Sequence, residues 1–152
     1  PAPSKRKREN VAEAIENNVR KLIIDETPVN PKFYEKMSEL LTDLVAQRRS
    51  GAIEYAEYLE KIAELVRAAK SGHGNTYPES MKSPGQKALF DNLGQDEALA
   101  RRVDEAVRAT APHGWRGHTM KEKKVRRCLE AEISDPDTVD TLLQILKNHG
   151  EY

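Results

Sequence analysis

Two stretches of helix-periodic apolar residues, which together span residues 28–70, constrain the fold of this chain most strongly. Within each stretch the apolar residues recur every three or four positions, as they do on one face of an α-helix. Ser50 and Gly51 predict a tight corner between the stretches, so the two helices should run antiparallel and cover each other's apolar face. The two faces comprise Phe33, Met37, Leu40, Leu41, Leu44 and Val45, and then Tyr55, Tyr58, Leu59, Ile62, Leu65, Val66 and Ala69. We expect this central hairpin to be the element on which the other helices pack.

Five further helices are predicted from the same periodicity and from residues that can cap a helix. Residues 83–86 and 119–122 have the spacing of a capping box, Ser-x-x-Gln and Thr-x-x-Glu. The expected caps are Ser4, Ser83, Asp96, Thr119 and Asp135. The residues expected on the inner faces of the five helices, in chain order, include Val11, Ala12, Val19 and Ile23; Ala88, Leu89 and Phe90; Val103 and Val107; Val125, Cys128 and Leu129; and Val139, Leu142, Leu143 and Leu146. No segment alternates as a β-strand does, so the predicted fold is all-α, a bundle of about seven helices.

Residues 71–83 contain Gly72, Gly74 and Pro78 among small polar residues, which predicts a loop. The length of the chain suits one domain with a modest core. We therefore expect a single helical domain over residues 1–152, which the loop can divide into two sub-bundles, residues 1–70 and 84–152.

The charge balance and the single cysteine limit the possible environments of the protein. The chain has 25 basic and 25 acidic residues, so any attraction to nucleic acid must come from a local patch. Cys128 alone cannot form an intramolecular disulfide, which favours a reducing, cytoplasmic location. No apolar run is long enough to predict a membrane span, so we expect no membrane partner. A chain that begins Pro-Ala-Pro is expected to be an excised part of a longer protein.

The motifs of common enzyme classes are absent from the sequence. Gly72 and Gly74 lack the Gly-Lys-Ser/Thr that would complete a phosphate-binding loop, and no serine lies in a nucleophile elbow. Cys128 falls on the apolar face of its predicted helix, which favours a core residue over a nucleophile. His113, His118 and Cys128 match no standard zinc spacing and lack an evident fourth ligand. We therefore predict no catalytic residue, no metal site and no cofactor in this chain.

The most distinctive feature of the sequence is a cluster of cations between residues 116 and 127. It comprises Arg116, Lys121, Lys123, Lys124, Arg126 and Arg127, against the single acid Glu122. From Glu130 to the end the balance reverses to six acids against Lys147. This cluster can contact DNA phosphates or form a salt-bridged protein interface, or it can be a solvated face that the acidic last helix partly neutralises.

Two other features could extend this basic patch. Lys5, Arg6, Lys7 and Arg8 occupy the first turn of the first predicted helix, where cations oppose the helix dipole. They indicate an acidic neighbour, a phosphate backbone or a helix that continues upstream, unless they form a solvated end. Trp115, beside Arg116, either stacks on a base or anchors an interface, or folds into the edge of the core.

Several stretches together resemble a known family. They are "IIDETPVNPKFYEKMSELLTDLV" at residues 23–45, "YLEKIAELV" at 58–66, "ALFDNLG" at 88–94, "WRGHTMKEKKVRRCL" at 115–129 and "ILKNHGEY" at the end. As a set they are similar to the C-terminal region of the motor (restriction) subunit of type I restriction–modification enzymes. The resemblance covers nearly the whole chain.

The resemblance implies a helical part of an ATP-dependent endonuclease that does no catalysis alone. In that family the nuclease and helicase motifs, which use ATP and Mg²⁺, precede this region. The implied partners are the methyltransferase and specificity subunits of the same complex, together with DNA. The alternatives are a purely structural helical cap of the motor subunit and a nucleotide-binding regulatory domain.

Overall fold

The computed structural model describes residues 4–152, which form seven α-helices, one short 3-10 helix and no β-strand. The predicted all-α fold is therefore confirmed for this part of the chain. The elements are α1 (Lys5–Glu26), η1 (Thr27–Val29), α2 (Pro31–Ser50), α3 (Tyr55–Ser71), α4 (Pro84–Asn92), α5 (Glu97–Thr110), α6 (Thr119–Glu132) and α7 (Pro136–Lys147). Among the described residues, no helix has the length and apolar character that crossing a membrane requires.

Four of the five predicted caps are present. The Ser4 hydroxyl accepts a hydrogen bond from the backbone N–H of Lys7 at 3.2 Å, and the Asp96 and Asp135 carboxylates cap α5 and α7 in the same way. Ser83 and Gln86 form a complete capping box at the start of α4. These side chains satisfy backbone donors that have no partner within a helix, which is why the sequence locates the starts of these helices well.

The predicted cap of α6 is wrong by one residue. Its N-cap is His118, whose Nδ1 accepts a hydrogen bond from the backbone N–H of Lys121, and Thr119 is the first helical residue. The carboxylate of Glu122 forms an ion pair with Lys147 at the end of α7.

The described chain divides into two compact units. The first unit comprises residues 4–27 and Tyr34–Gly72, which include α1, most of α2 and α3. The second unit comprises Pro28–Phe33 and His73–Tyr152, which include α4 to α7.

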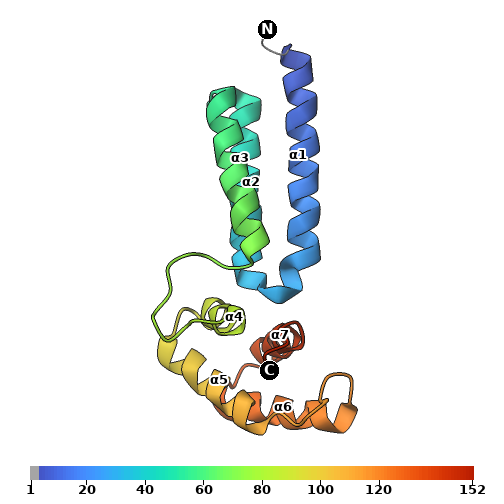
Figure 1. Ribbon diagram of the computed structural model, residues 1–152, viewed down its shortest axis with the longest axis vertical. Coiled ribbons are helices and arrows are strands. Elements are labelled where there is room, and N and C mark those ends of the chain that lie inside the picture. The colour runs from blue at the N-terminus through green and yellow to red at the C-terminus, as the bar shows by residue number, and fades with distance from the viewer. Residues whose placement is uncertain (1–3) are drawn as a thin grey trace. The chain divides into compact units, whose positions relative to one another are not determined.

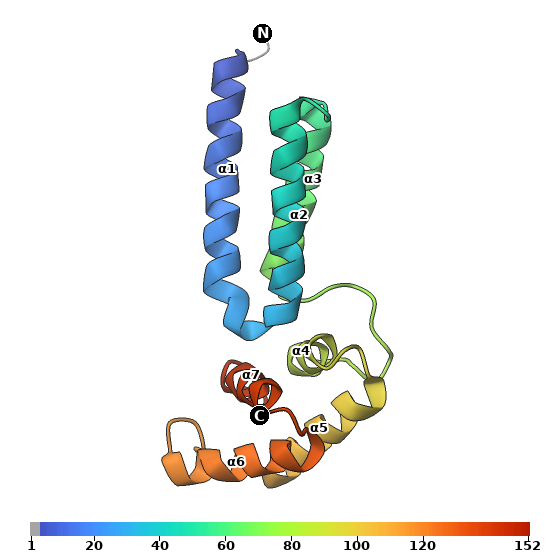
Figure 2. The same ribbon diagram turned by 180° about the vertical axis from the view of Figure 1, so that it is seen from behind.

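The first unit is a bundle of three helices that lie side by side (Figures 1 and 2). The predicted corner follows α2, where Gly51 adopts a positive φ of 74° that a residue without a side chain tolerates best. At the opposite end of the α2–α3 pair, the Tyr34 hydroxyl donates to the carbonyl oxygen of Ala69 at 2.6 Å. The pair is thus antiparallel, and α1 covers it along one side (Figure 1).

Two residues of the predicted apolar faces are exposed. Leu40 retains 44% of its surface and Val11 retains 42%, whereas their neighbours Leu41 and Ala12 are buried. A bundle of three helices covers only the inner side of each helix, and the flank of the predicted stripe remains in solvent.

The second unit has a core of its own. α5 and α6 form one layer, and α4 and α7 cross it as a second layer (Figures 1 and 2). The fully buried residues of this core include Leu89 in α4, Val107 in α5, Leu129 in α6 and Leu142 in α7. No residue of the α2–α3 hairpin belongs to this core. The expectation that the remaining helices pack on the hairpin is therefore not confirmed, because four of them bury their apolar faces against one another.

The segment between α1 and α2 belongs to the second unit through hydrogen bonds. Asn30, which is fully buried, donates from Nδ2 to Asp91 at 2.8 Å and accepts from Asn92 at 2.7 Å. A ring nitrogen of His149 lies 2.8 Å from the carbonyl oxygen of Val29. These contacts satisfy polar groups of the short connection in which the chain passes from α1 to α2.

The predicted loop before α4 is fastened by one tyrosine. Tyr77 donates its phenolic hydrogen to Asp91 at 2.6 Å and accepts a hydrogen bond from the backbone N–H of Gly74 at 3.0 Å. Its ring packs edge-on against Phe90, with 5.7 Å between the ring centroids. Burial and the neighbouring Asp91 carboxylate raise the pKa of the Tyr77 phenol above its usual value, so the hydroxyl remains a donor at neutral pH.

Adjacent leucines in α2 provide a matched test of this packing. Leu41 is 2% exposed, so Leu41→Ala should lower the free energy of unfolding by about 3 kcal/mol through lost burial and a residual cavity. Leu40→Ala, at a residue that is already 44% exposed, should cost less than about 1 kcal/mol. Urea unfolding followed by circular dichroism measures both values, and equal losses would contradict the packing of α2 described above.

Candidate functional site

The basic surface predicted around residues 116–127 centres on α6. Val125 and Leu129 turn inward and are buried in the core of the second unit. Lys123 and Arg127 lie on the opposite side of the helix and Lys124 lies on its flank, and all three are exposed. No ion pair joins any of these three to a carboxylate within residues 4–152. We call these three residues the α6 face.

The guanidinium of Arg116 is bound to the end of α7. It donates to the backbone carbonyl oxygens of Leu146 at 3.0 Å, Lys147 at 3.1 Å and His149 at 2.5 Å. The last carbonyl groups of a helix have no partner within the helix and carry partial negative charge, which a cation stabilises. The structure therefore gives Arg116 a role in holding the C-terminal end of α7.

Two further predicted cations have partners in the same unit. The Lys121 ammonium donates to the carbonyl oxygen of His113 at 2.8 Å, which ties the start of α6 to the preceding loop. Arg126 forms an ion pair with Asp140 at 2.7 Å. Both side chains of this pair are substantially exposed, and solvent screening limits its contribution to stability. Asp140 nevertheless offsets the charge of Arg126, so the α6 face carries the unbalanced charge.

Trp115 is a core residue. Only 2% of its surface is exposed, and it packs in the core of the second unit. The Arg116 guanidinium lies over its ring, 4.9 Å from the centroid. The interpretation of Trp115 as a platform for a nucleic-acid base is therefore wrong, because its ring is already covered on all sides. The alternative, a loop tryptophan folded into the core edge, is the one that the structure shows.

The cluster formed by Lys5, Arg6, Lys7 and Arg8 lies at the start of α1 and belongs to the first unit, whereas the α6 face belongs to the second. Arg6 and Lys7 are exposed, while Arg8 is half-buried with its guanidinium 5.1 Å from the centroid of the Tyr55 ring. The four predicted cations thus differ in exposure and in their contacts.

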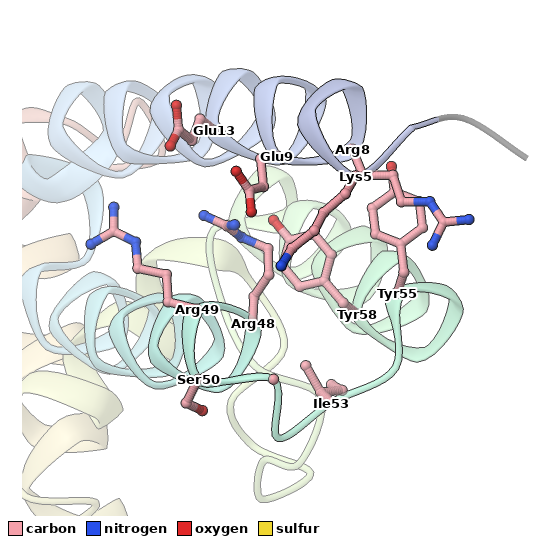
Figure 3. Close-up of a pocket in the computed structure, with 11 residues that line it drawn as sticks. Lys5, Arg8, Glu9, Glu13, Arg48, Arg49, Ser50, Ile53, Tyr55 and Tyr58 are labelled. Atoms are coloured by element: carbon pink, nitrogen blue, oxygen red, sulfur yellow. The ribbon is translucent and has the colours of Figure 1, made fainter.

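Lys5 and Arg8 line a pocket of the first unit with a volume of about 490 Å³ (Figure 3). The pocket lies between the start of α1, the end of α2 and the start of α3. Its lining residues are Lys5, Arg8, Glu9, Glu13, Arg48, Arg49, Ser50, Gly51, Ile53, Tyr55 and Tyr58.

A buried ionic network adjoins this pocket and was missed by sequence reasoning. Glu16, which is 1% exposed, accepts hydrogen bonds from Arg48 Nε at 2.7 Å and from the second guanidinium nitrogen at 3.0 Å. The Tyr58 hydroxyl donates to the same carboxylate at 2.8 Å. One residue from each of α1, α2 and α3 therefore meets here. The available signal was the position of Glu16, which falls on the inner face of α1 between Ala12 and Val19.

The pKa shifts in this network follow from its geometry. Burial alone would raise the pKa of the Glu16 carboxyl, but the hydrogen bonds from Arg48 and Tyr58 and the charge of Arg48 lower it below its usual value overall. Burial and the adjacent carboxylate raise the pKa of the Tyr58 phenol. Glu16 is thus ionised and Tyr58 neutral at physiological pH, so each donor faces an acceptor.

The remaining sequence candidates form no further site in the described chain. Cys128 is half-buried against the core of the second unit, and burial raises the pKa of its thiol. Within residues 4–152, three or more histidine, cysteine or carboxylate side chains nowhere gather as they would around a metal ion.

Comparison of the chain with protein-family models, with curated proteins and with solved structures finds no match.

The Glu16 network predicts a pH-dependent stability of the first unit. Replacement of a buried, paired carboxylate by Glu16→Gln should cost about 3 kcal/mol at about pH 7, because the Arg48 charge then lacks its partner. The pKa of Glu16 is lower in the folded than in the unfolded chain, where it is about 4.3. The ionised carboxylate therefore stabilises the fold fully above that value, and this contribution disappears as the pH falls through the folded pKa.

Urea unfolding of the wild-type protein and of Glu16→Gln should accordingly differ most near neutral pH and converge in acid. Glu39→Gln is the matched control, since Glu39 is exposed on α2 and has no ion pair among the residues described. It should leave stability nearly unchanged at every pH. A difference between wild type and Glu16→Gln that stays constant into acid would contradict an ionised Glu16.

Proposed function

We propose that this chain is a non-catalytic helical module of a type I restriction enzyme, in which it holds the motor subunit on the methyltransferase–specificity core. The proposal is supported by the five stretches that resemble the C-terminal region of the motor subunit. ATP and Mg²⁺ would then act in other parts of that subunit, and the choice of DNA sequence would belong to the specificity subunit. The module would act in the cytoplasm.

The observation that carries the proposed contact is the α6 face. Lys123, Lys124 and Arg127 are held on a packed helix, and no ion pair with a carboxylate of the described chain neutralises them. Lys123 and Arg127 are one helical turn apart, where like charges repel each other. A phosphate backbone or an acidic protein surface would relieve this repulsion, whereas solvent relieves it only in part.

The α6 face would supplement the protein contacts that hold the complex together. A chain without net charge has no long-range attraction for duplex DNA, and three cations alone give binding that salt weakens steeply. We therefore propose that assembly with the core is the main function and that DNA contact through the α6 face is an addition to it. A purely structural cap is the competing function, because Arg116, Lys121 and Arg126 already make contacts within the chain.

The triple charge reversal Lys123→Glu, Lys124→Glu and Arg127→Glu tests the α6 face. Fluorescence anisotropy of this chain against the methyltransferase–specificity core, with and without a DNA duplex, gives the affinities at several salt concentrations. If the three cations contact phosphates, the slope of log K against log salt in the presence of DNA should become shallower by about 3, since each lost phosphate contact removes about 0.9.

The matched control reverses three exposed cations of the first unit, Lys21, Lys36 and Arg67, which have no ion pair in the described chain. This control changes the net charge equally, so it should leave the salt slope unchanged if the contact is local to α6. Unaltered binding of the α6 variant to the core and to DNA would assign these cations to a solvated face. Absence of any binding by the wild-type chain would favour the structural cap.

A further inference from the structure

The last two residues of the chain lie in a site that α4 and α5 form together. Glu151 accepts hydrogen bonds from the backbone N–H of Gly85 at 2.6 Å and from the Arg108 guanidinium at 2.5 Å. Tyr152 donates its phenolic hydrogen to Asp104 at 2.6 Å, and the Arg108 guanidinium lies over its ring, 4.6 Å from the centroid. We call these two residues the Glu-Tyr segment. Both of its side chains are held by specific polar contacts.

The half of the site that holds Glu151 suits a carboxylate. Gly85 lies in the first turn of α4, where backbone N–H groups have no partner within the helix and carry partial positive charge. Arg108 adds a full charge, which it shares between Glu151 and Asp104. Any side chain on residue 85 would collide with the carboxylate of Glu151 and the ring of Tyr152, so the close approach requires glycine.

The other half of the site suits a phenol. Asp104 is 6% exposed, and it accepts from Gln86 at 3.1 Å and from Arg108 Nε at 2.8 Å in addition to Tyr152. The ring of Tyr152 packs against the core of the second unit. Burial and the hydrogen bond to Asp104 raise the pKa of this phenol, so it remains a donor at neutral pH. A phenylalanine ring would fill the same space but would deprive a buried carboxylate of one donor.

The Glu-Tyr segment can leave this site without disrupting the core. It is joined to α7 through Gly150, which is exposed and has no other group within 4 Å of the place where a Cβ would lie. The fully buried core residues, such as Leu89, Val107 and Leu142, belong to the helices themselves. Local opening of a segment with few buried contacts costs less free energy than global unfolding. The site is therefore one from which its occupant can be exchanged.

We propose that Gly85, Asp104 and Arg108 form a binding site for a Glu-Tyr segment of a partner protein, which the chain's own Glu-Tyr segment fills when that partner is absent. The two segments compete for the same hydrogen-bonding groups. Because its own segment is attached to the chain, its effective concentration is high, and the partner must displace it. The proposal is independent of the assembly function, because none of these residues belongs to the α6 face.

NMR titration of the full chain with the peptide acetyl-Gly-Glu-Tyr tests the site, and the backbone amide of Gly85 is the direct readout. In the double variant Glu151→Ser, Tyr152→Ser the resonance of this amide should move away from its wild-type position. Saturating peptide should return it toward that position, with one site per chain. The wild-type chain should bind the peptide about tenfold more weakly than the double variant, since an attached segment reaches millimolar effective concentration.

Substitutions on both sides of the contact test its chemistry. Arg108→Gln, added to the double variant, should weaken peptide binding about tenfold, as the loss of a hydrogen bond to a charged group predicts. Arg101→Gln is the matched control, because Arg101 lies on the same helix, is exposed and pairs with Glu105 outside the site. It should leave the affinity unchanged. The peptides acetyl-Gly-Gln-Tyr and acetyl-Gly-Glu-Phe should each bind about tenfold more weakly than acetyl-Gly-Glu-Tyr.

Three results would overturn the proposal. They are a Gly85 resonance in the double variant that does not respond to the peptide, equal binding of the three peptides, and equal affinity of the wild-type chain and the double variant. The same spectra show whether each variant is folded. If the double variant is unfolded, Glu151→Gln alone retains the contacts of Tyr152 and should still bind the peptide more tightly than the wild-type chain does. Equal binding by these two chains would also overturn the proposal.

Discussion

The buried carboxylate of Glu16 is the constraint on which the first unit depends. It is ionised in a place that solvent hardly reaches, so it requires both the Arg48 guanidinium and the Tyr58 hydroxyl. A buried ion pair adds little net stability compared with an apolar contact, but it penalises every arrangement that separates its partners. Three helices with apolar stripes can slide or rotate against one another at low cost. The Glu16 network favours the one register in which α1, α2 and α3 meet at this point.

The second unit uses the same device at its C-terminal end. Asp104 lies on the inner face of α5 and is 6% exposed, and it accepts hydrogen bonds from Gln86, Arg108 and Tyr152. The neighbouring Glu151 accepts from the backbone N–H of Gly85, where any side chain on residue 85 would collide with Glu151 and Tyr152. The last two residues are thus fastened to the start of α4 and to the C-terminal half of α5. In both units a buried acid sets the packing, and apolar burial supplies most of the stability.

The sequence predicted what local chemistry determines and missed what tertiary contacts determine. Helix periodicity and the caps at Ser4, Ser83, Asp96 and Asp135 are local, and the structure confirms them. The cap at Thr119 was wrong because the imidazole of His118, one residue earlier, accepts the hydrogen bond from the backbone N–H of Lys121. Arg116 was predicted to be a free surface cation, and for Trp115 the sequence left a surface role and the core edge open. Their partners at the end of α7 and in the core come from other helices, so local sequence could not identify them. Leu40 was predicted to be buried, but it is exposed. Periodicity shows which side of a helix is apolar and does not show how much of that side the neighbouring helices cover.

The basic residues show how such assignments can be refined. A cluster of cations in a sequence indicates only that positive charge is concentrated there. The structure shows which of these cations have a partner within the chain and which do not. Arg116 and Lys121 are bound to backbone carbonyl oxygens, and Arg126 lies beside Asp140. Lys123, Lys124 and Arg127 in one unit and Lys5 and Arg49 in the other have no carboxylate partner among the described residues. The chain as a whole is neutral, and two of the acids that balance these cations, Glu9 and Glu13, line the same pocket as Lys5 and Arg49. The charged surfaces of a neutral helical protein therefore depend on which charges the fold leaves unpaired, and the periodicity of the apolar residues does not determine that.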